Sequence, residues 1–177
     1  IRDSRRTMLQ GIGGVGATAV RRKRHRAVLS IDLDRFKAVN DEHGHLVGDR
    51  VLAVVGERLR HGVRGDAALI RFGGDEFLVI AAPVASVDEA RDLAEKILAI
   101  GAEPFSIDGR ELQISLSIGV AVADGPTTPA ELIGDSDIAA YRAKGLGRGR
   151  VELFDEELRR QIIQRHETGQ GLRLGLE

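Results

Sequence analysis

Hydrophobic and polar residues alternate along this chain in blocks that predict a succession of strands and helices. Residues 27–33, AVLSIDL, are rich in apolar and β-branched side chains, which predicts a central strand whose polar end carries Asp32 and Asp34. Over 46–63 the apolar residues recur with a period close to 3.6, which is typical of a helix. Two apolar runs, 67–72 and 77–82, flank a Gly-Gly pair and predict a β-hairpin.

The second half of the chain continues the pattern. Ser86 and Glu89 have the spacing of a capping box, which predicts a helix to about residue 100. The runs 104–107 and 112–123 surround Asp108-Gly109 and predict a second hairpin. Strict alternation of apolar residues over 112–122 predicts a strand with one covered face.

Three more elements complete the predicted order. Thr128 and Glu131 form another capping box around a proline, which predicts a helix to about residue 144, ending at Gly145. Residues 151–154 predict a short last strand, and 155–166 a charged helix. The order β, α, β-hairpin, α, β-hairpin, α, β predicts an α/β domain with one mixed sheet and helices packed against it.

Composition narrows the classes of function. The 177 residues suffice for one domain, and 42% hydrophobic and 30% charged residues are ordinary for a globular protein. A net charge of −1 and only 3% aromatic residues argue against a nucleic-acid partner. The lack of cysteine excludes disulfides and thiolate metal sites and suits the cytoplasm. No apolar run approaches the roughly 18 residues of a membrane span, and no signal peptide is visible.

Residues 1–26 form a poorly defined N-terminal segment. The chain starts with Ile1 rather than Met, which indicates a piece of a longer protein. Residues 11–16 fit G-x-G-x-x-G, with Asp32 following, but no convincing strand precedes them, as a dinucleotide site requires. The basic run 21–26 is either a nucleic-acid patch or the solvated end of a short helix.

Residues 71–77, RFGGDEF, carry the most specific pattern in the chain. Two glycines followed by two carboxylates at a hairpin turn allow close approach of a ligand and supply hard oxygen ligands for Mg²⁺. The same letters also fit a hairpin with an acidic, solvated tip. If Asp32 and Asp75 lie on neighbouring strands, their carboxylates meet at one end of the sheet. The alternative for Asp32 and Asp34 is a capping role at the strand end.

This hairpin resembles the signature of GGDEF domains, the diguanylate cyclases, and residues 31–49 and 137–148 resemble two further segments of that family. The resemblance assigns 27–154 to a GGDEF domain and 155–177 to a connector helix like that between GGDEF and EAL domains. It implies an adenylyl-cyclase-like fold, in which helices flank a mixed, largely antiparallel five-stranded sheet. It also implies condensation of two GTP molecules into cyclic di-GMP, with release of pyrophosphate.

The resemblance assigns roles to individual residues. It implies that Asp32, the backbone carbonyl of Leu33, and Asp75 hold two Mg²⁺ ions, with Mn²⁺ as an alternative. It gives Asp75 the activation of the attacking 3′-hydroxyl, and Glu76 is a second candidate. Two metals at the α-phosphate would polarise it and acidify that hydroxyl.

The substrate contacts implied by the resemblance lie in three segments. Guanine is recognised through hydrogen bonds that adenine cannot make, and cations bind the phosphates. An aromatic side chain packs against the base, and two glycines leave room for the ribose and phosphates. These residues are Phe36, Lys37, Asn40, Asp49, Gly73, Gly74, Lys144 and Arg148. Asp49 is alternatively an N-cap, and the cations after the 128–144 helix alternatively offset its dipole.

Stoichiometry predicts the partners. One domain holds one GTP, but the product contains two guanylyl units, so two domains must face each other as a symmetric homodimer. An attached EAL domain, a sensory domain or both are also expected. No nucleic acid is expected as a partner.

Three departures from the family pattern matter. The family opening D-x-L-T-G-L-x-N-R aligns with 7–15, where only Leu9, Gly11 and a conservative Ile12 agree, which puts dimer coupling and turnover in doubt. The inhibitory R-x-x-D motif retains Arg64, but its acid, Asp66, lies one place early, so product inhibition is expected to be weak or absent. The usual Asn after Gly-Arg is Gly149.

Two functions from different classes therefore fit the sequence best. The first is an active diguanylate cyclase. The alternative is a catalytically inactive GTP-binding module that regulates an attached EAL phosphodiesterase. A nucleic-acid binder built on the basic run is a third reading, and it predicts binding that weakens steeply with salt.

Overall fold

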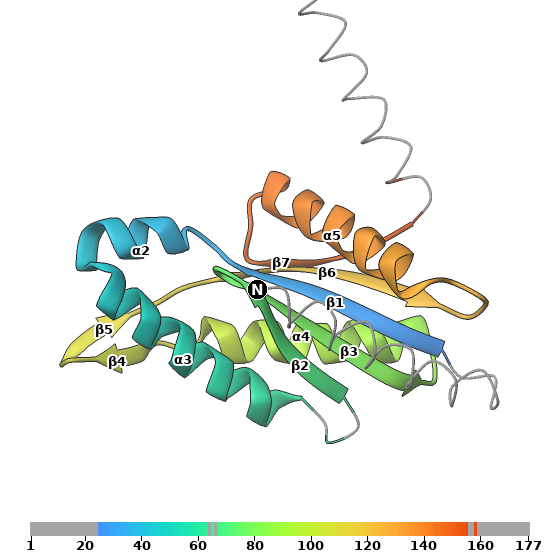
Figure 1. The fold of residues 1–177 in the computed structure, drawn as a ribbon, viewed down its shortest axis with the longest axis horizontal. Coiled ribbons are helices and arrows are strands. Elements are labelled where there is room, and N and C mark those ends of the chain that lie inside the picture. Colours follow the sequence, from blue (N-terminus) through green and yellow to red (C-terminus); the bar gives the residue numbers. More distant parts are fainter. Residues whose placement is uncertain (1–24, 64, 66, 156–157, 159–177) are drawn as a thin grey trace, which may run out of the picture.

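The computed structural model describes residues 25–63, 65, 67–155 and 158. At its centre is a five-stranded sheet in the order β2-β3-β1-β6-β7 (Figure 1). β1 pairs antiparallel with both β3 and β6, β2 pairs antiparallel with β3, and β7 runs parallel to β6. The predicted mixed, largely antiparallel sheet is therefore confirmed. The bounds are β1 His25–Leu33, β2 Ala67–Gly73, β3 Glu76–Val84, β6 Leu116–Ala123 and β7 Arg150–Leu153.

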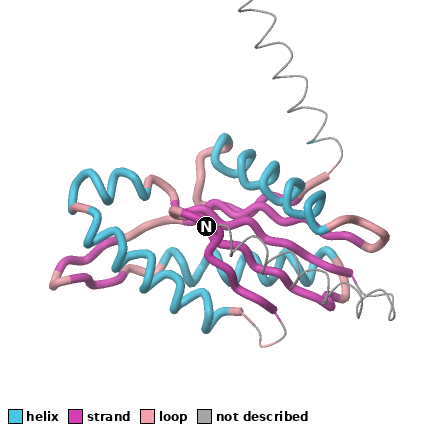
Figure 2. The backbone as a smooth tube through the Cα atoms, viewed as in Figure 1, coloured by secondary structure: helices cyan, strands magenta, loops and turns pink. Residues whose placement is uncertain are grey.

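Helices cover both faces of this sheet. α3 and α4 lie on one side of the strands, and α5 lies on the other (Figure 2). The short α2 connects the end of β1 to α3 and forms a corner with it. The bounds are α2 Phe36–His43, α3 His45–Gly62, α4 Val87–Ala102 and α5 Pro129–Gly145.

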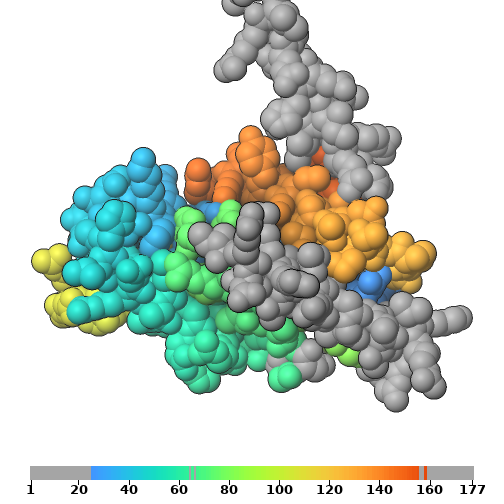
Figure 3. Space-filling view, viewed as in Figure 1, coloured from blue at the N-terminus to red at the C-terminus, as the bar shows by residue number. Residues whose placement is uncertain are grey.

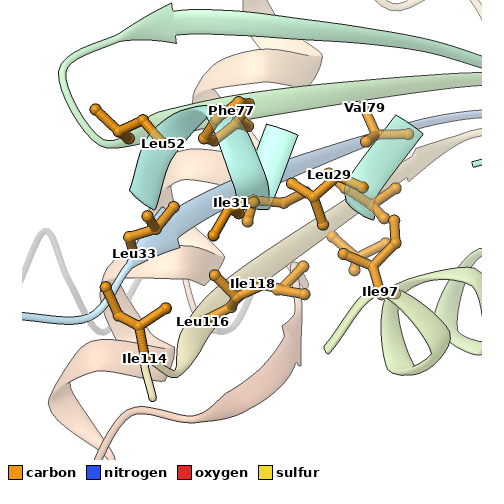
Figure 4. Close-up of a cluster of buried hydrophobic side chains, with 14 of the residues drawn as sticks. Leu29, Ile31, Leu33, Leu52, Phe77, Val79, Ile97, Ile114, Leu116 and Ile118 are labelled. Atoms are coloured by element: carbon orange, nitrogen blue, oxygen red, sulfur yellow. The ribbon is translucent and has the colours of Figure 1, made fainter. Parts of the chain in front are cut away.

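The main core lies between the sheet and the α3–α4 layer. Alternate residues of β1, among them Leu29, Ile31 and Leu33, point into this layer with Phe77 and Ile97 (Figure 4). The other face of β1 carries Val28, which joins a smaller cluster beneath α5. Because side chains alternate across a strand, Ser30 and Asp32 also belong to the α5 face.

The strand prediction over 112–123 is wrong in two respects. The run divides into β5, Arg110–Leu112, and β6, and β5 pairs only with β4, Phe105–Ile107, as a separate two-stranded sheet. Both faces of β6 are buried, rather than one. The reason is Gly119, where a Cβ atom would lie 2.1 Å from Ser136 O and Ala140 N. Without a side chain at this position, α5 packs directly on the strand.

Several local predictions are confirmed. The Thr128 hydroxyl accepts from the Glu131 N–H, and the Glu131 carboxylate accepts from the Thr128 N–H, which completes that capping box. The Ser86 hydroxyl accepts from the Glu89 N–H at 3.2 Å and caps α4. Asp108 and Gly109 both have positive φ in the β4–β5 turn.

Other predictions differ from the structure or lie outside it. α2 was not predicted, because it is only eight residues long and buries only Phe36. The segment 1–24 and most of the predicted 155–166 helix lie outside the described residues. Among the described residues, no helix combines the length and apolar composition that a membrane span needs.

Candidate functional site

The hairpin turn lies beside the end of β1. Asp32 is paired with Glu76 in the β1–β3 register, and the Leu33 N–H donates to the Asp75 carbonyl at 3.2 Å. The two acids that were expected to converge are therefore at the same end of the sheet. Figure 3 shows the β2–β3 turn at the surface between the α2–α3 corner and α5.

The turn residues are Gly74 and Asp75, and Gly73 still belongs to β2. Gly74 has a φ of +52°, and the space where a Cβ of Gly73 or Gly74 would lie is open to 4 Å. The Arg71 guanidinium donates two hydrogen bonds to the Gly74 carbonyl, at 2.8 and 3.1 Å. A bare backbone surface, braced by Arg71, thus lies next to the acids, as a ligand that approaches closely requires.

α5 brings a cation to the same place. The Lys144 Nζ lies 2.6 Å from Asp32 Oδ2, across 112 residues of sequence. The close packing of α5 on Gly119 is what places its last turn beside β1. Lys144 therefore contacts a candidate metal ligand directly, in addition to any effect on the helix dipole.

The electrostatics of the acids reflect this crowding. Burial raises the pKa of Asp32 above its ordinary 3.8, and the nearby charges of Asp75 and Asp34 raise it further, against the opposing effect of Lys144. Burial, followed by the charges of Asp32 and Asp137, raises the pKa of Glu76 above 4.5. Carboxylates that repel one another in this way are stabilised by a bound divalent cation.

The donor set fits Mg²⁺ better than a cation that needs a full protein cage. Among the described residues, no group of three or more His, Cys, Asp or Glu side chains is arranged to hold a metal. The expected ligands, Asp32, Asp75 and the Leu33 carbonyl, would supply a few hard oxygen atoms from one edge. Mg²⁺ is usually bound through one or two carboxylates and completes its coordination with water and phosphate oxygens.

Asp34 forms the most complete polar network of the site. It is only 5% exposed, and its Oδ1 accepts from the Ser117 hydroxyl at 2.6 Å. Its Oδ2 accepts from the Ser115 hydroxyl at 2.6 Å and from the Gly149 N–H at 3.1 Å. Asp34 therefore does more than cap the strand end, because its partners are Ser117 of β6, Ser115 just before β6 and Gly149 in the loop before β7.

Gly149 has a structural explanation in the same network. Its φ is +59°, a left-handed conformation that glycine adopts freely and that asparagine tolerates best among other residues. A glycine in place of the usual asparagine therefore preserves the backbone conformation. The N–H that Asp34 accepts is present with either residue.

The residues expected to read the base lie along α2 and α3. Gly48 packs so closely on α2 that a Cβ atom there would lie 1.9 Å from Asn40 Oδ1 and 3.1 Å from the Phe36 ring. Asn40 is therefore held against the turn of α3 that carries Asp49. The N-cap alternative for Asp49 is wrong, because α3 begins at His45 and Gly44 is its N-cap.

Two cavities lie at the candidate site, next to Asp32 and Arg148. One of about 230 Å³ lies between β3 and α5 and is lined by Asp32, Glu76, Asp137, Tyr141 and Lys144, among others. A larger, open one of about 690 Å³ lies between α2 and the 110–115 segment and reaches Arg148. Asp32, Glu76 and Lys144 thus line a cleft rather than a flat surface.

The structure places in the site residues that sequence reasoning missed, and it does not test one predicted residue. Asp137 accepts from the Ser30 hydroxyl at 2.5 Å, and Ser115 and Ser117 bind Asp34. These pairs join positions more than 80 apart, so no local pattern marks them. Arg64, the residue considered for an inhibitory product site, lies outside the described residues and stays a prediction.

Comparison with known proteins agrees with this geometry. Residues 3–150 match the family model described as "Diguanylate cyclase, GGDEF domain". Diguanylate cyclase TpbB of Pseudomonas aeruginosa is 43% identical over 131 residues, which are 73% of this chain and 30% of TpbB. The bifunctional diguanylate cyclase/cyclic di-GMP phosphodiesterase MucR of the same species is 39% identical over 160 residues, 90% of this chain and 23% of MucR.

The fold agrees as well. The crystal structure of the GGDEF domain of TpbB superposes with a TM-score of 0.80 at 38% identity, covering 85% of this chain and 95% of that one. The chain spans less than a third of the length of either curated relative. With its fold, its signature hairpin and its matched length in agreement, the chain belongs to the GGDEF domain family.

Proposed function

We propose that this domain is an active diguanylate cyclase, which condenses two GTP molecules into cyclic di-GMP and pyrophosphate as a symmetric homodimer with Mg²⁺. The observation that carries the proposal is the convergence of Asp32, Asp75 and Lys144 at the end of β1. Similarity to proteins named diguanylate cyclases supports the same activity.

Each group of residues has a task in this reaction. Lys144 and Arg148 bind the triphosphate, and the open backbone of Gly73 and Gly74 leaves room for it. Asn40 and Asp49 accept and donate hydrogen bonds at the guanine edge, with Phe36 beneath and Lys37 as a further phosphate contact. Mg²⁺ held by Asp32, Asp75 and the Leu33 carbonyl would polarise the α-phosphate and lower the pKa of the 3′-hydroxyl.

Proton removal from the attacking 3′-hydroxyl falls to a carboxylate at the turn. Asp75 is the first candidate by family resemblance. Glu76 is the second, and its raised pKa suits a general base better than an ordinary carboxylate does. In a pair of facing domains, each 3′-hydroxyl attacks the other nucleotide's α-phosphate, and pyrophosphate leaves in line.

The second candidate is an inactive GTP-binding module that regulates an attached EAL phosphodiesterase in the cytoplasm. Its supporting observations are the departure of residues 7–15 from the family opening and the similarity to NbdA of P. aeruginosa, named a cyclic di-GMP phosphodiesterase, at 35% identity. Both candidates predict GTP binding, so binding alone does not separate them.

Product formation from GTP separates the two. The domain, and a longer piece with its native flanks, are incubated with GTP and Mg²⁺, and cyclic di-GMP is quantified by chromatography. Turnover that Asp75→Ala abolishes, with an unchanged far-UV spectrum, supports the cyclase. GTP binding without product from either protein contradicts it and favours the regulatory module.

A further inference from the structure

Two hydrogen bonds, one from Arg148 and one from the residue after it, hold the backbone around Arg148 in place. Its own N–H donates to the Ala143 carbonyl at the end of α5 at 3.0 Å. The next N–H, that of Gly149, donates to Asp34 Oδ2 at 3.1 Å. Between these two anchors, Arg148 has a φ of +67°, a left-handed conformation that side chains other than glycine adopt only where surrounding contacts impose it.

The Asp34 carboxylate is the rigid part of this arrangement. Asp34 is buried, and its backbone N–H donates to the Ser115 carbonyl at 2.9 Å. One side-chain oxygen accepts from the hydroxyl of Ser117 in β6, and the other from the hydroxyl of Ser115 just before β6. Every one of these donors is neutral, so they orient the negative charge without cancelling it. The carboxylate therefore presents a fixed charge to the loop 147–149.

Arg148 lies next to that charge, and most of its hydrogen-bond donors remain available. Its Nε is 3.9 Å from Asp34 Oδ1, and its side chain is 46% exposed. A guanidinium carries five N–H donors in a planar fork, so contact through one edge leaves donors for a phosphate. The arrangement resembles a pre-oriented anion clamp rather than a closed ion pair.

We propose that Asp34 is a positioning residue, which holds Arg148 and the 147–149 backbone in the conformation that receives the triphosphate of GTP. The inference rests on the proposed function and assigns a role to a residue outside the proposed metal and nucleotide contacts. A purely structural role, in which Asp34 only ties β1 to β6, is the competing explanation.

A double-mutant cycle separates the two roles. The ligand is the unreactive analogue of GTP with a methylene bridge between the α- and β-phosphates, measured with Mg²⁺ by titration calorimetry on the 177-residue chain. Asp34→Asn removes the negative charge that attracts Arg148 and replaces one oxygen with an NH2 group, which cannot accept from the Gly149 N–H. We expect a loss of affinity of about tenfold, in line with hydrogen bonds to charged groups.

The same change is then made in the Arg148→Ala background. A positioning role predicts that Asp34→Asn costs less than about twofold there, since the residue it positions is absent. An equal loss in both backgrounds, or no loss in either, overturns the inference. Arg150→Ala is the matched control, because this neighbouring arginine lies 3.8 Å from Glu152 instead and should leave affinity unchanged.

Thermal unfolding checks that each variant is folded. If Asp34→Asn fails to fold, Ser115→Ala, which removes one of the donors that orient Asp34, takes its place in the cycle with a smaller loss of about threefold. If the unsubstituted chain does not bind the analogue at all, the proposed function fails and this inference fails with it. If it binds and the cycle is additive, only the inference fails.

Discussion

At the end of β1, charged side chains already contact one another, whereas the residues expected to read the base have few partners along α2 and α3. Asp32 pairs with Lys144 at 2.6 Å, and Asp34 is saturated with donors. Asp49 is exposed and makes no hydrogen bond or ion pair with the described part of the chain.

This difference indicates how the two parts of the site are expected to work. We call the acids and cations at the end of β1 the phosphate end, and the residues on α2 and α3 that are expected to bind guanine the base end. Charges held in place before the ligand arrives cost little reorganisation when phosphate and metal bind, which favours catalysis. Base-reading groups that gain partners only from the nucleotide contribute discrimination rather than fold stability. Substitutions at the phosphate end should therefore affect turnover and stability, and those at the base end should affect specificity alone.

The largest effect is expected from Lys144→Ala. Loss of this cation removes a phosphate contact and leaves Asp32 without its neutralising partner. We expect turnover to fall by about 10²–10³-fold, the range seen when a single charge-stabilising donor is removed. Steady-state production of cyclic di-GMP measures it. A loss of less than about threefold would show that the phosphate end does not depend on this pair.

Gly119→Ala tests what holds the phosphate end together. A Cβ atom there meets backbone atoms of α5 at 2.1 Å, which cannot move as a flexible side chain can. We expect the free energy of unfolding to fall by about 3 kcal/mol, at the upper end of overpacking costs. Chemical denaturation measures it.

Gly134→Ala is the control on the same helix. Nothing lies within 4 Å of its Cβ position, so the change should stabilise the chain by up to about 1 kcal/mol through helix propensity. Equal effects of the two substitutions would contradict the close-packing account of α5.

Asp49→Asn tests the base end. It should lower the preference for GTP over ATP by about tenfold or more, because the guanine N1–H and amino group lose a carboxylate acceptor. The unfolding temperature should stay within about 1 °C, since Asp49 is exposed. Competition titrations with both nucleotides measure the preference. Comparable ATP and GTP rates in the unsubstituted protein would refute the roles given to Asn40 and Asp49.

The pH dependence follows from the raised pKa values of Asp32 and Glu76. The folded chain holds these protons more tightly than the unfolded chain does, so the contribution of these two groups to stability is greatest below the ordinary values of 3.8 and 4.5. It should fall as pH rises through the interval up to the raised values. Affinity for Mg²⁺ should rise over the same interval, because the cation requires the deprotonated carboxylates.

The substitution Glu76→Gln isolates the contribution of the Glu76 carboxylate to the pH dependence of stability. The variant should be more stable than the unsubstituted chain at pH 7, and the difference should disappear toward pH 3, where both side chains are neutral. Thermal unfolding across this pH range measures it. A variant that is less stable at pH 7 would contradict the crowded-carboxylate account of the site.

The smallest effect is expected at Arg64. Because Asp66 lies one residue away from the family position, Arg64→Ala should leave the affinity for cyclic di-GMP within about twofold. Isothermal titration with the product measures it. A tenfold loss would mean that a rearranged loop preserves the inhibitory site.

Most of the fold could be predicted from local patterns in the sequence. The capping residues Ser86 and Thr128 located their helices, and the Gly-Gly and Asp-Gly pairs located both hairpins, because these signals act within a few residues. The split of 112–123 and the burial of both faces of β6 could not be read locally. The burial of the second face depends on α5, which approaches Gly119 from another part of the chain.

The candidate site divides in the same way. The convergence of Asp32 and Asp75 followed from strand ends and a hairpin turn, and the structure bears it out. The Lys144 contact was expected only as a phosphate contact, and the serines around Asp34 were not expected at all. Such contacts arise where strands and helices distant in sequence pack together, and no spacing rule describes them.

The central claim is that Asp32 and Asp75 jointly hold divalent cations against the phosphates of a bound GTP. Electron paramagnetic resonance with Mn²⁺ in place of Mg²⁺ tests it directly, with the unreactive GTP analogue present. The account predicts Mn²⁺ bound in the ternary complex, and a loss of affinity of at least about tenfold in either Asp32→Asn or Asp75→Asn. Mn²⁺ and analogue binding that both substitutions leave unchanged would contradict it.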